Sequence, residues 1–440
     1  MSHSDPHIAG RHGADGLIAC HECDRLHRLA PLPAGGEARC GRCSATLYRN
    51  VPHSLDRSAA LYLAALFLFV MANVFPFIAL KFGERVEQTV LVSGAFALGR
   101  AGMPELGVLV FLTSFLFPLL TLGGMLYVVM AHRLGTRPPY LAAVYRMVSA
   151  LAPWSLIGVF MLALLVSIVK LMDMASVVPG PGLYAFVALL VVASAAVANF
   201  EHGTVWPRIG PRTLPAGGGD PHASQGSAAK HGLIACHVCE LLVEARRAGA
   251  GCPRCGSALH AARKPESLSR TWALLAAATV LLIPANVYPV MTVIQLGQGE
   301  PNTILSGVLH LIQAGMWPLA LLVFFASFVV PFSKIAVLVL LLVTVQRGSG
   351  WRPRDRTRLY RITEVIGAWS MVDVFLVAIL VALVNMDSLA TVRPGPGVPF
   401  FAAAVIATML AAHAFDPRLI WDRAGRGRAS APGRTRGVAT

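Results

Sequence analysis

Long apolar runs alternate with short polar stretches over most of this chain. Each run is long enough for a helix to cross a hydrocarbon core about 30 Å thick, which takes roughly 20 residues. The two shortest runs each follow a Pro-Gly-Pro-Gly sequence. The pattern therefore predicts eight transmembrane helices, near residues 59–80, 106–131, 148–171, 183–200, 272–296, 317–345, 362–386 and 398–415.

The second half of the chain repeats the first. Gly16–Cys23 returns as Gly232–Cys239, and Asn73–Pro76 returns as Asn286–Pro289. These and the other matched motifs keep an offset between 212 and 216 residues. A fixed period of this kind is the mark of a tandem duplication. Each copy consists of a Cys-rich polar head followed by four apolar segments.

We therefore predict an all-α integral membrane protein, built as a tandem repeat of a zinc ribbon plus four transmembrane helices. Residues 1–58 show no cleavable signal peptide, because they are polar and rich in Cys and Arg. The stretches 1–14, 210–230 and 422–440 have the Gly, Pro and Arg content of disordered segments. The predicted domains are a first ribbon at 1–58, a first four-helix unit at 59–205, a linker and second ribbon at 206–270, a second four-helix unit at 271–421, and a basic tail at 422–440.

The charges fit this arrangement. Only 13% of the 440 residues are charged, against about 25% in an ordinary globular domain. The net charge of +15 would usually suggest nucleic-acid binding. However, 31 of the 37 basic residues lie in segments that share one side of an eight-helix topology. The positive-inside rule then places both termini and both ribbons in the cytoplasm, and no nucleic-acid partner is expected. Since four spans is an even number, the two copies point the same way.

Eight cysteines form two sets of paired CxxC knuckles, all outside the apolar runs. Two knuckles separated by 12 or 16 residues can direct four thiolates at one Zn²⁺. A disulfide or redox pair is the competing interpretation, which a reducing cytoplasm disfavours, and another metal such as iron is a third. With four protein ligands each site is closed and therefore structural, and it could also serve as a docking surface. The predicted zinc ligands are Cys20, Cys23, Cys40, Cys43, Cys236, Cys239, Cys252 and Cys255.

Two charges lie deep in the apolar runs, Lys334 in the sixth span and Asp373 in the seventh. A charge at this depth costs at least about 2.5 kcal/mol and so usually faces a cavity or a partner. Ser327 lies two turns before Lys334, which predicts that both share a helix face, and Thr408 lies at comparable depth. Pro331 allows a kink between them. We predict a Ser327–Lys334–Asp373–Thr408 network; a buried ion pair that only fixes helix packing is the alternative.

The first copy lacks this charged pair. Aligned by the repeat, Lys334 corresponds to Thr121 and Asp373 to Gly158, while Thr408 corresponds to Ala193. The fold therefore does not require the pair, which favours a function specific to the second half, such as proton-linked gating.

The segments opposite the basic side are short. We expect 81–105 and 297–316 to be loops with interfacial helical character, and the two Pro-Gly-Pro-Gly sequences to be stiff loops. The Asn-Val-Phe-Pro and Asn-Val-Tyr-Pro sequences predict a break or a kink in the first helix of each copy.

Together, the paired CxxC heads, the Asn-Val-x-Pro sequences, Trp369–Phe375 and Phe415–Arg418 resemble the paraquat-inducible protein A family over roughly residues 16–421. The resemblance implies a multi-pass protein of the inner membrane. It also implies a periplasmic partner that carries MCE domains and forms a tunnel, and a role in moving phospholipid or other hydrophobic molecules.

We expect a lipid-transport subunit and not an enzyme. The chain has no GxxxxGK[ST] sequence, so a nucleotide-hydrolysing site is not expected. A zinc-ribbon scaffold or stress sensor without transport is the alternative, and a membrane redox protein is a third possibility. A scaffold would depend on the cysteines but not on Lys334 and Asp373.

Overall fold

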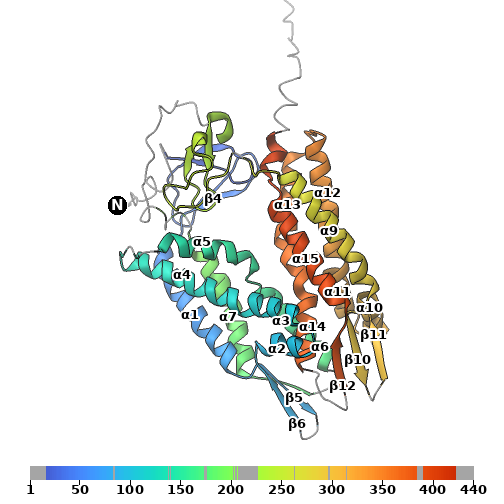
Figure 1. Cartoon of the computed structure of the whole chain (residues 1–440). Helices are drawn as coiled ribbons and strands as arrows, with labels where there is room; N and C mark the ends of the chain where they lie inside the picture. The colour runs from blue at the N-terminus through green and yellow to red at the C-terminus, as the bar shows by residue number, and fades with distance from the viewer. Residues whose placement is uncertain are drawn as a thin grey trace, which may run out of the picture.

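The computed structural model describes residues 16–82, 85–136, 138, 140–172, 176–201, 203, 206, 226–261, 263–295, 298–313, 315–383 and 390–422. Two helical units stand side by side, with Cys-rich ribbons at one end and small β-sheets at the other (Figure 1). Within the described residues, eight helical stretches are long and apolar enough to span a membrane, which confirms the predicted number. Of the segments expected to be disordered, 1–14 and most of 210–230 and 422–440 lie outside the described residues. The prediction was wrong for 226–230, because Ser227 pairs with Arg25 of the first ribbon and a 3₁₀ turn begins at Ala228.

In the first repeat, the first and fourth spans are unbroken helices that pack along each other, whereas the second and third spans are interrupted. The second contains a π-helical turn and the third a 3₁₀ turn. In chain order the helical elements are α1 (Ser54–Val74), α2 (Ser93–Arg100), α3 (Pro104–Phe111), η2 (Leu112–Leu116), α4 (Phe117–Arg133), α5 (Leu141–Leu151), η3 (Ala152–Trp154), α6 (Ile157–Met172) and α7 (Pro181–Asn199).

The second repeat has the same interruptions at the same places. Its π turn directly precedes Pro331, where we expected a kink. In chain order its helical elements are α9 (Ser267–Val287), α10 (Ile304–Gln313), α11 (Trp317–Phe324), η7 (Phe325–Val329), α12 (Val330–Gln346), α13 (Pro353–Gly367), η8 (Ala368–Met371), α14 (Val372–Leu383) and α15 (Gly397–Ala414).

The third span of each repeat differs from its predicted bounds. The Arg-rich segment 346–361, expected to be a loop, is helical from Pro353 onward. Pro at the first helical position, Asp355 in the first turn, and one buried face that includes Tyr360 explain why this polar sequence forms a helix.

The sheet end corrects the all-α prediction. The expected loops 81–105 and 297–316 contain the second strand of a hairpin, followed by α2 or α10, and the first strand of each hairpin begins within the range predicted for the first span. A third strand, which lies just before the fourth span, pairs with the first strand of each hairpin. Ile78, at the start of the first of these strands, is buried. The strands are β5 (Ile78–Phe82), β6 (Arg85–Thr89) and β7 (Ser176–Pro179) in the first repeat, and β10 (Met291–Gln295), β11 (Gln298–Asn302) and β12 (Ala390–Pro394) in the second.

The Asn-Val-x-Pro and Pro-Gly-Pro-Gly sequences lie against each other. The Asn-Val-x-Pro sequence ends the first helix of each repeat, because α1 stops at Val74 and α9 stops at Val287. It therefore does not kink a helix that continues beyond it. In the second repeat, Gly395 N donates to Val290 O at 2.8 Å and Gly397 N donates to Pro289 O at 3.0 Å. A Cβ added to Gly395 would lie 2.1 Å from Pro289 O, so this contact requires glycine. The expected stiff loop is therefore a tight junction between the first and fourth spans.

The ribbons pack on the opposite repeats. The cysteines of the first ribbon belong to an apolar cluster with Tyr360 and Trp421 of the second repeat. Those of the second ribbon belong to a cluster with Tyr145 and Trp206 of the first. The ribbon strands are β1 (Leu17–Ala19), β2 (Leu26–Arg28), β3 (Glu37–Arg39) and β4 (Thr46–Arg49) in the first ribbon, and β8 (Leu233–Ala235) and β9 (Leu242–Glu244) in the second; short 3₁₀ turns, η5 (Ala228–His231) and η6 (Ala245–Arg247), flank β8 and β9.

The transmembrane units meet mainly through α14, which packs on α2 and α6. Phe160 and Phe375 make an edge-to-face contact there, with ring centroids 5.4 Å apart. In the apolar stretch of the span that contains α14, 76% of the residues are buried, against 22–61% of the residues in the other spans. The third span of the second repeat is therefore the central helix of the molecule, and it carries Asp373.

Candidate metal centres and intramembrane cavity

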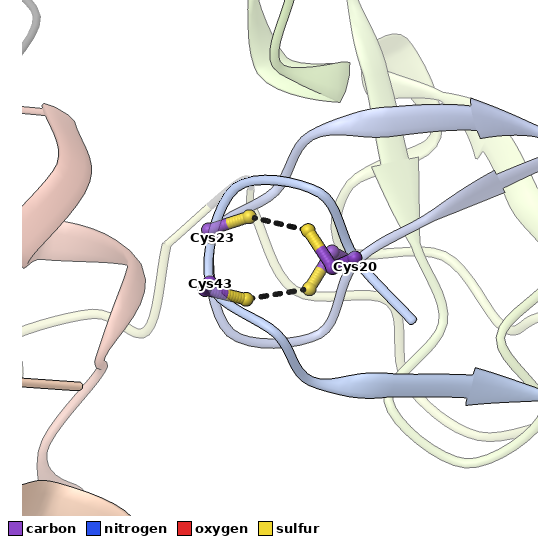
Figure 2. Close-up of side chains that lie close together, drawn as sticks. Cys20, Cys23 and Cys43 are labelled. Carbon is purple, nitrogen blue, oxygen red and sulfur yellow. Dashed lines mark hydrogen bonds between the residues drawn. The ribbon is translucent and has the colours of Figure 1, made fainter. Parts of the chain in front are cut away.

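The eight cysteines form two buried tetrads, as predicted. Within each tetrad the four sulfur atoms lie within 4.8 Å of one another. Cys20 and Cys43 Sγ are 3.4 Å apart, and Cys23 and Cys40 Sγ 3.5 Å; the sulfur atoms of Cys20, Cys23 and Cys43 point toward one another in Figure 2. A disulfide needs about 2.05 Å, whereas four ligands about 2.3 Å from a tetrahedral ion lie roughly 3.8 Å apart. Both tetrads therefore suit a metal ion.

The backbone of every knuckle has the same turn. The residue after the second cysteine has a positive φ and donates its N–H to the carbonyl of the first cysteine, at 2.8–2.9 Å. Gly256 occupies this position in the fourth knuckle, with φ 72°. The other three turns use Asp24 (φ 61°), Ser44 (φ 60°) and Glu240 (φ 57°).

Hydrogen-bond donors surround the sulfur atoms. His27 Nε2 lies 3.2 Å from Cys40 Sγ, and the Arg42 amide donates to the same sulfur at 3.4 Å. In the second tetrad, the Ser257 hydroxyl lies 3.0 Å from Cys255 Sγ. Donors at these positions spread the negative charge of thiolates, which is the form that binds a metal. With four protein ligands, neither tetrad leaves a position for a substrate.

Lys334 is 1% exposed and lies in α12. Its Nζ donates to Thr408 Oγ1 at 2.8 Å and to the carbonyl of Gly367 at 3.2 Å. Gly367 is the last residue of α13 and the 3₁₀ turn η8 follows it directly, so the regular helix is interrupted where this carbonyl accepts the bond. The predicted pair of Lys334 and Thr408 thus lies together, and the third partner is a backbone group.

Ser327 and Asp373 lie together in a different place. Both line a small cavity of about 50 Å³ with mainly apolar walls that include Leu319, Val377 and Phe401. Among the described residues, neither Ser327 Oγ nor Asp373 Oδ2 has a hydrogen-bond partner. The four predicted residues therefore form two groups, and the described ion pairs do not include one between Lys334 and Asp373.

The π turn explains this separation. We expected Ser327 and Lys334 on one face because seven residues make two regular turns. Ser327 instead lies within the π-helical turn η7, and the regular helix that carries Lys334 begins only after this turn. A π turn inserts the equivalent of one extra residue and so rotates the side chains before it relative to those after it.

The corresponding space in the first repeat is smaller. It encloses about 20 Å³, and Ile379 and Ala382 of α14 form part of its wall. Small-molecule sites usually measure about 300–1,000 Å³, so both spaces are smaller than such a site, and the second-repeat cavity is the larger of the two. Together with the four polar residues, this distinguishes the second repeat as the one with a candidate site.

Sequence reasoning missed the buried carboxylates at the ribbon end, among them Asp416 and Glu22. Burial raises the pKa of Asp416, but Arg418 and hydrogen bonds from two backbone amides lower it to a net value below its usual range. Burial likewise raises the pKa of Glu22, and hydrogen bonds with His21 and Arg361 more than offset this. Phe415–Arg418 was visible as a motif, whereas Glu22 offered no signal because its partner lies 339 residues away.

The comparisons with known proteins agree with the repeat. The family model described as "Paraquat-inducible protein A" matches residues 55–210 and 268–425, one match on each helical unit. The chain belongs to the paraquat-inducible protein A family. The resemblance drawn from its motifs is therefore confirmed.

Three relatives of this PqiA-family chain are matched over nearly their whole length. "Intermembrane transport protein PqiA" of Escherichia coli is 34% identical over 95% of this chain and 97% of its own. "Lipophilic envelope-spanning tunnel protein A" of the same species is 31% identical over 93% and 92%. "Probable intermembrane transport protein" of Haemophilus influenzae is 26% identical over 92% and 95%. No solved structure matches this chain.

Proposed function

We propose that this protein is the inner-membrane subunit of a lipid transport system. It passes phospholipid or another hydrophobic molecule to or from a periplasmic tunnel made of MCE domains. The observation that carries the proposal is the cavity in the second repeat, which has apolar walls and two polar groups, Ser327 and Asp373, facing it. Such a lining suits an amphipathic molecule, because the walls contact its chains and the polar groups its headgroup. The names of the relatives support transport between membranes.

The charge pattern supports the orientation. The basic segments lie at the ribbon end, so the positive-inside rule places both ribbons and both termini in the cytoplasm. The sheet end then faces the periplasm. Val290 and Met291, next to and within β10, line the cavity, so it reaches the periplasmic end, where a tunnel protein would meet it.

Zinc is the ion that best fits the two tetrads, since four thiolates in tetrahedral geometry favour Zn²⁺. Cys20, Cys23, Cys40 and Cys43 would hold one ion, and Cys236, Cys239, Cys252 and Cys255 the other. The ion organises each ribbon and takes no part in transport chemistry.

The intramembrane residues control access to the cavity. Asp373 faces the cavity itself, while Lys334 joins α12 to α15 through Thr408 and to the end of α13 through Gly367. A proton taken up or released at these sites changes the cost of keeping them buried, and so favours one arrangement of these helices over another. This links transport to the proton gradient.

Substitution of Lys334 and Asp373 by Ala, singly and together, tests the proposal. We expect loss of envelope integrity in cells, at normal protein levels and with both metal ions retained. Ser114→Ala and Thr121→Ala are matched controls from the first repeat and should leave function intact. Full function in the double variant would refute the transport site. A scaffold without transport predicts that result, together with loss of function when the cysteines are replaced.

A photoreactive lipid provides a direct test of cargo. A photoreactive phospholipid should crosslink to residues of the cavity, such as Val377, in wild-type protein. Val377→Trp, which would fill the cavity, should abolish that crosslink. Equal labelling of both proteins would contradict the assignment of lipid to this cavity.

A further inference from the structure

An arginine from the opposite repeat holds each ribbon. Arg361 of α13 donates to the carbonyl of Cys43 at 2.8 Å. Arg146 of α5 donates to the carbonyl of Cys255. The repeat equates Arg146 with Arg361 and Cys43 with Cys255. The same contact therefore occurs twice, each time between a ribbon and the transmembrane unit that does not follow it in the chain.

The acceptors are backbone carbonyls of a metal-binding knuckle. Besides Arg361, Arg354 of the same helix donates to Arg42 O at 2.8 Å and to Gly41 O at 3.2 Å. Three successive carbonyls of the Cys40–Cys43 turn thus accept hydrogen bonds from α13. Small Cys₄ domains depend on their metal to fold, so these carbonyls are correctly placed only when the tetrad is loaded.

We propose that each ribbon, through its bound metal, positions the third transmembrane helix of the other repeat. Metal at Cys20–Cys43 holds α13, and metal at Cys236–Cys255 holds α5. This coupling goes beyond the proposed transport function, and its readout does not depend on transport.

The helix that the first ribbon holds leads to the polar site. Arg361 and Gly367 are six residues apart on α13, roughly 9 Å along a rigid helix. Gly367 O accepts from Lys334 Nζ. The first ribbon therefore positions the carbonyl that Lys334 needs, whereas the second ribbon holds a repeat that has Thr121 in place of that lysine.

The two contacts also differ in strength. Glu22 of the first ribbon makes a bidentate ion pair with Arg361, and the Glu22 side chain is 9% exposed. The equivalent residue in the second ribbon is Val238, so Arg146 has no corresponding carboxylate. Arg42 of the first ribbon also lies over the Trp421 ring, 4.6 Å from its centroid. The first ribbon is therefore held more firmly.

Hydrogen–deuterium exchange of the full chain in nanodiscs tests the coupling, with metal content measured on the same samples. Cys40→Ser/Cys43→Ser should lose one metal ion and speed exchange in α13 by roughly tenfold, while α5 stays unchanged. Cys252→Ser/Cys255→Ser should give the reverse. Faster exchange confined to the helices of the same repeat, or equal in α5 and α13, would overturn the proposal.

Variants that keep all eight thiolates decide the question if the cysteine variants do not accumulate. Arg361→Gln and Arg146→Gln should retain both metal ions and still speed exchange in α13 and α5 respectively. Glu22→Val gives the first ribbon the residue that the second ribbon has at the equivalent position, Val238, and should speed exchange in α13. Val238→Glu adds the missing carboxylate and should slow exchange in α5. Unchanged exchange in both arginine variants would refute the proposal.

Discussion

Replacement of Gly395 by alanine tests the junction between the Asn-Val-x-Pro and Pro-Gly-Pro-Gly sequences. The added Cβ would lie 2.1 Å from Pro289 O and 2.8 Å from Pro289 C. An ordinary carbon–oxygen contact is about 3.3–3.6 Å, so the two backbones must move apart by roughly 1 Å. Both are main chain, so no rotamer change can relieve the clash.

The cost follows from the contacts that this movement breaks. Gly395 N–Val290 O and Gly397 N–Pro289 O are 2.8 and 3.0 Å long, and neither survives the separation. Each is worth about 0.5–1.5 kcal/mol net, and the strain of overpacking adds about 1–3 kcal/mol. We therefore expect Gly395→Ala to lower the free energy of unfolding by roughly 2–6 kcal/mol.

Thermal unfolding of the purified protein in detergent measures this effect. Gly395→Ala should melt roughly 2–6 °C below wild type, because for a chain of this length each kcal/mol shifts the melting temperature by about 1 °C. Gly99→Ala is the control, because a Cβ there meets no atom within 4 Å and Gly99 lies in a helix, where alanine is preferred. It should melt at or above the wild-type temperature. If Gly395→Ala melts within about 1 °C of wild type, the assigned contact is wrong.

Three further predictions concern the metal sites, the ribbon end and the contact between units. Purified protein should carry about two zinc ions per chain, and Cys20→Ser/Cys23→Ser about one by elemental analysis; two retained ions would contradict the tetrads. Asp416→Asn should cost about 3 kcal/mol at pH 7. Because the pKa of Asp416 is lower in the native than in the unfolded state, the carboxylate stabilises the fold at pH values above the unfolded pKa, and this stabilisation disappears as pH falls through the native pKa. The difference in denaturant unfolding between Asp416→Asn and wild type should therefore shrink at acidic pH. A pH-independent difference would refute this. Gly94→Ala should destabilise, since a Cβ there lies 3.2 Å from a carbonyl of α14, whereas the equivalent Gly307→Ala meets nothing within 4 Å and should not; equal melting temperatures would argue against the α2–α14 contact.

Features that depend on local pattern were predictable. The eight spans and the two tetrads follow from residue type and spacing within short windows. The β-sheets were not predictable in this way, because β5 pairs with β7 about a hundred residues later, Ile78 opposite Pro179. Strand pairing between distant segments leaves no local period, and each strand alone is too short to distinguish from a loop.

The polar site shows a different limit. Residue types placed Lys334 and Asp373 at depth, but charge alone suggested that they pair with each other. Lys334 instead donates to the carbonyl of Gly367, at the point where α13 is followed by the 3₁₀ turn η8. Any residue has a carbonyl, so no side-chain pattern could reveal it. The crossing of the ribbons is hidden for a similar reason, since a repeat shows which positions are equivalent and not which copies touch.

The crossed ribbons set the order in which the chain can be completed during synthesis. The second ribbon meets a helix already made, because Cys255 follows Arg146 by 109 residues. The first ribbon is in the opposite position, since Arg361 lies 318 residues after Cys43. It is the first part of the described chain to leave the ribosome, yet it must wait undocked until the seventh span has been made. Its own metal is what can keep it folded during that delay.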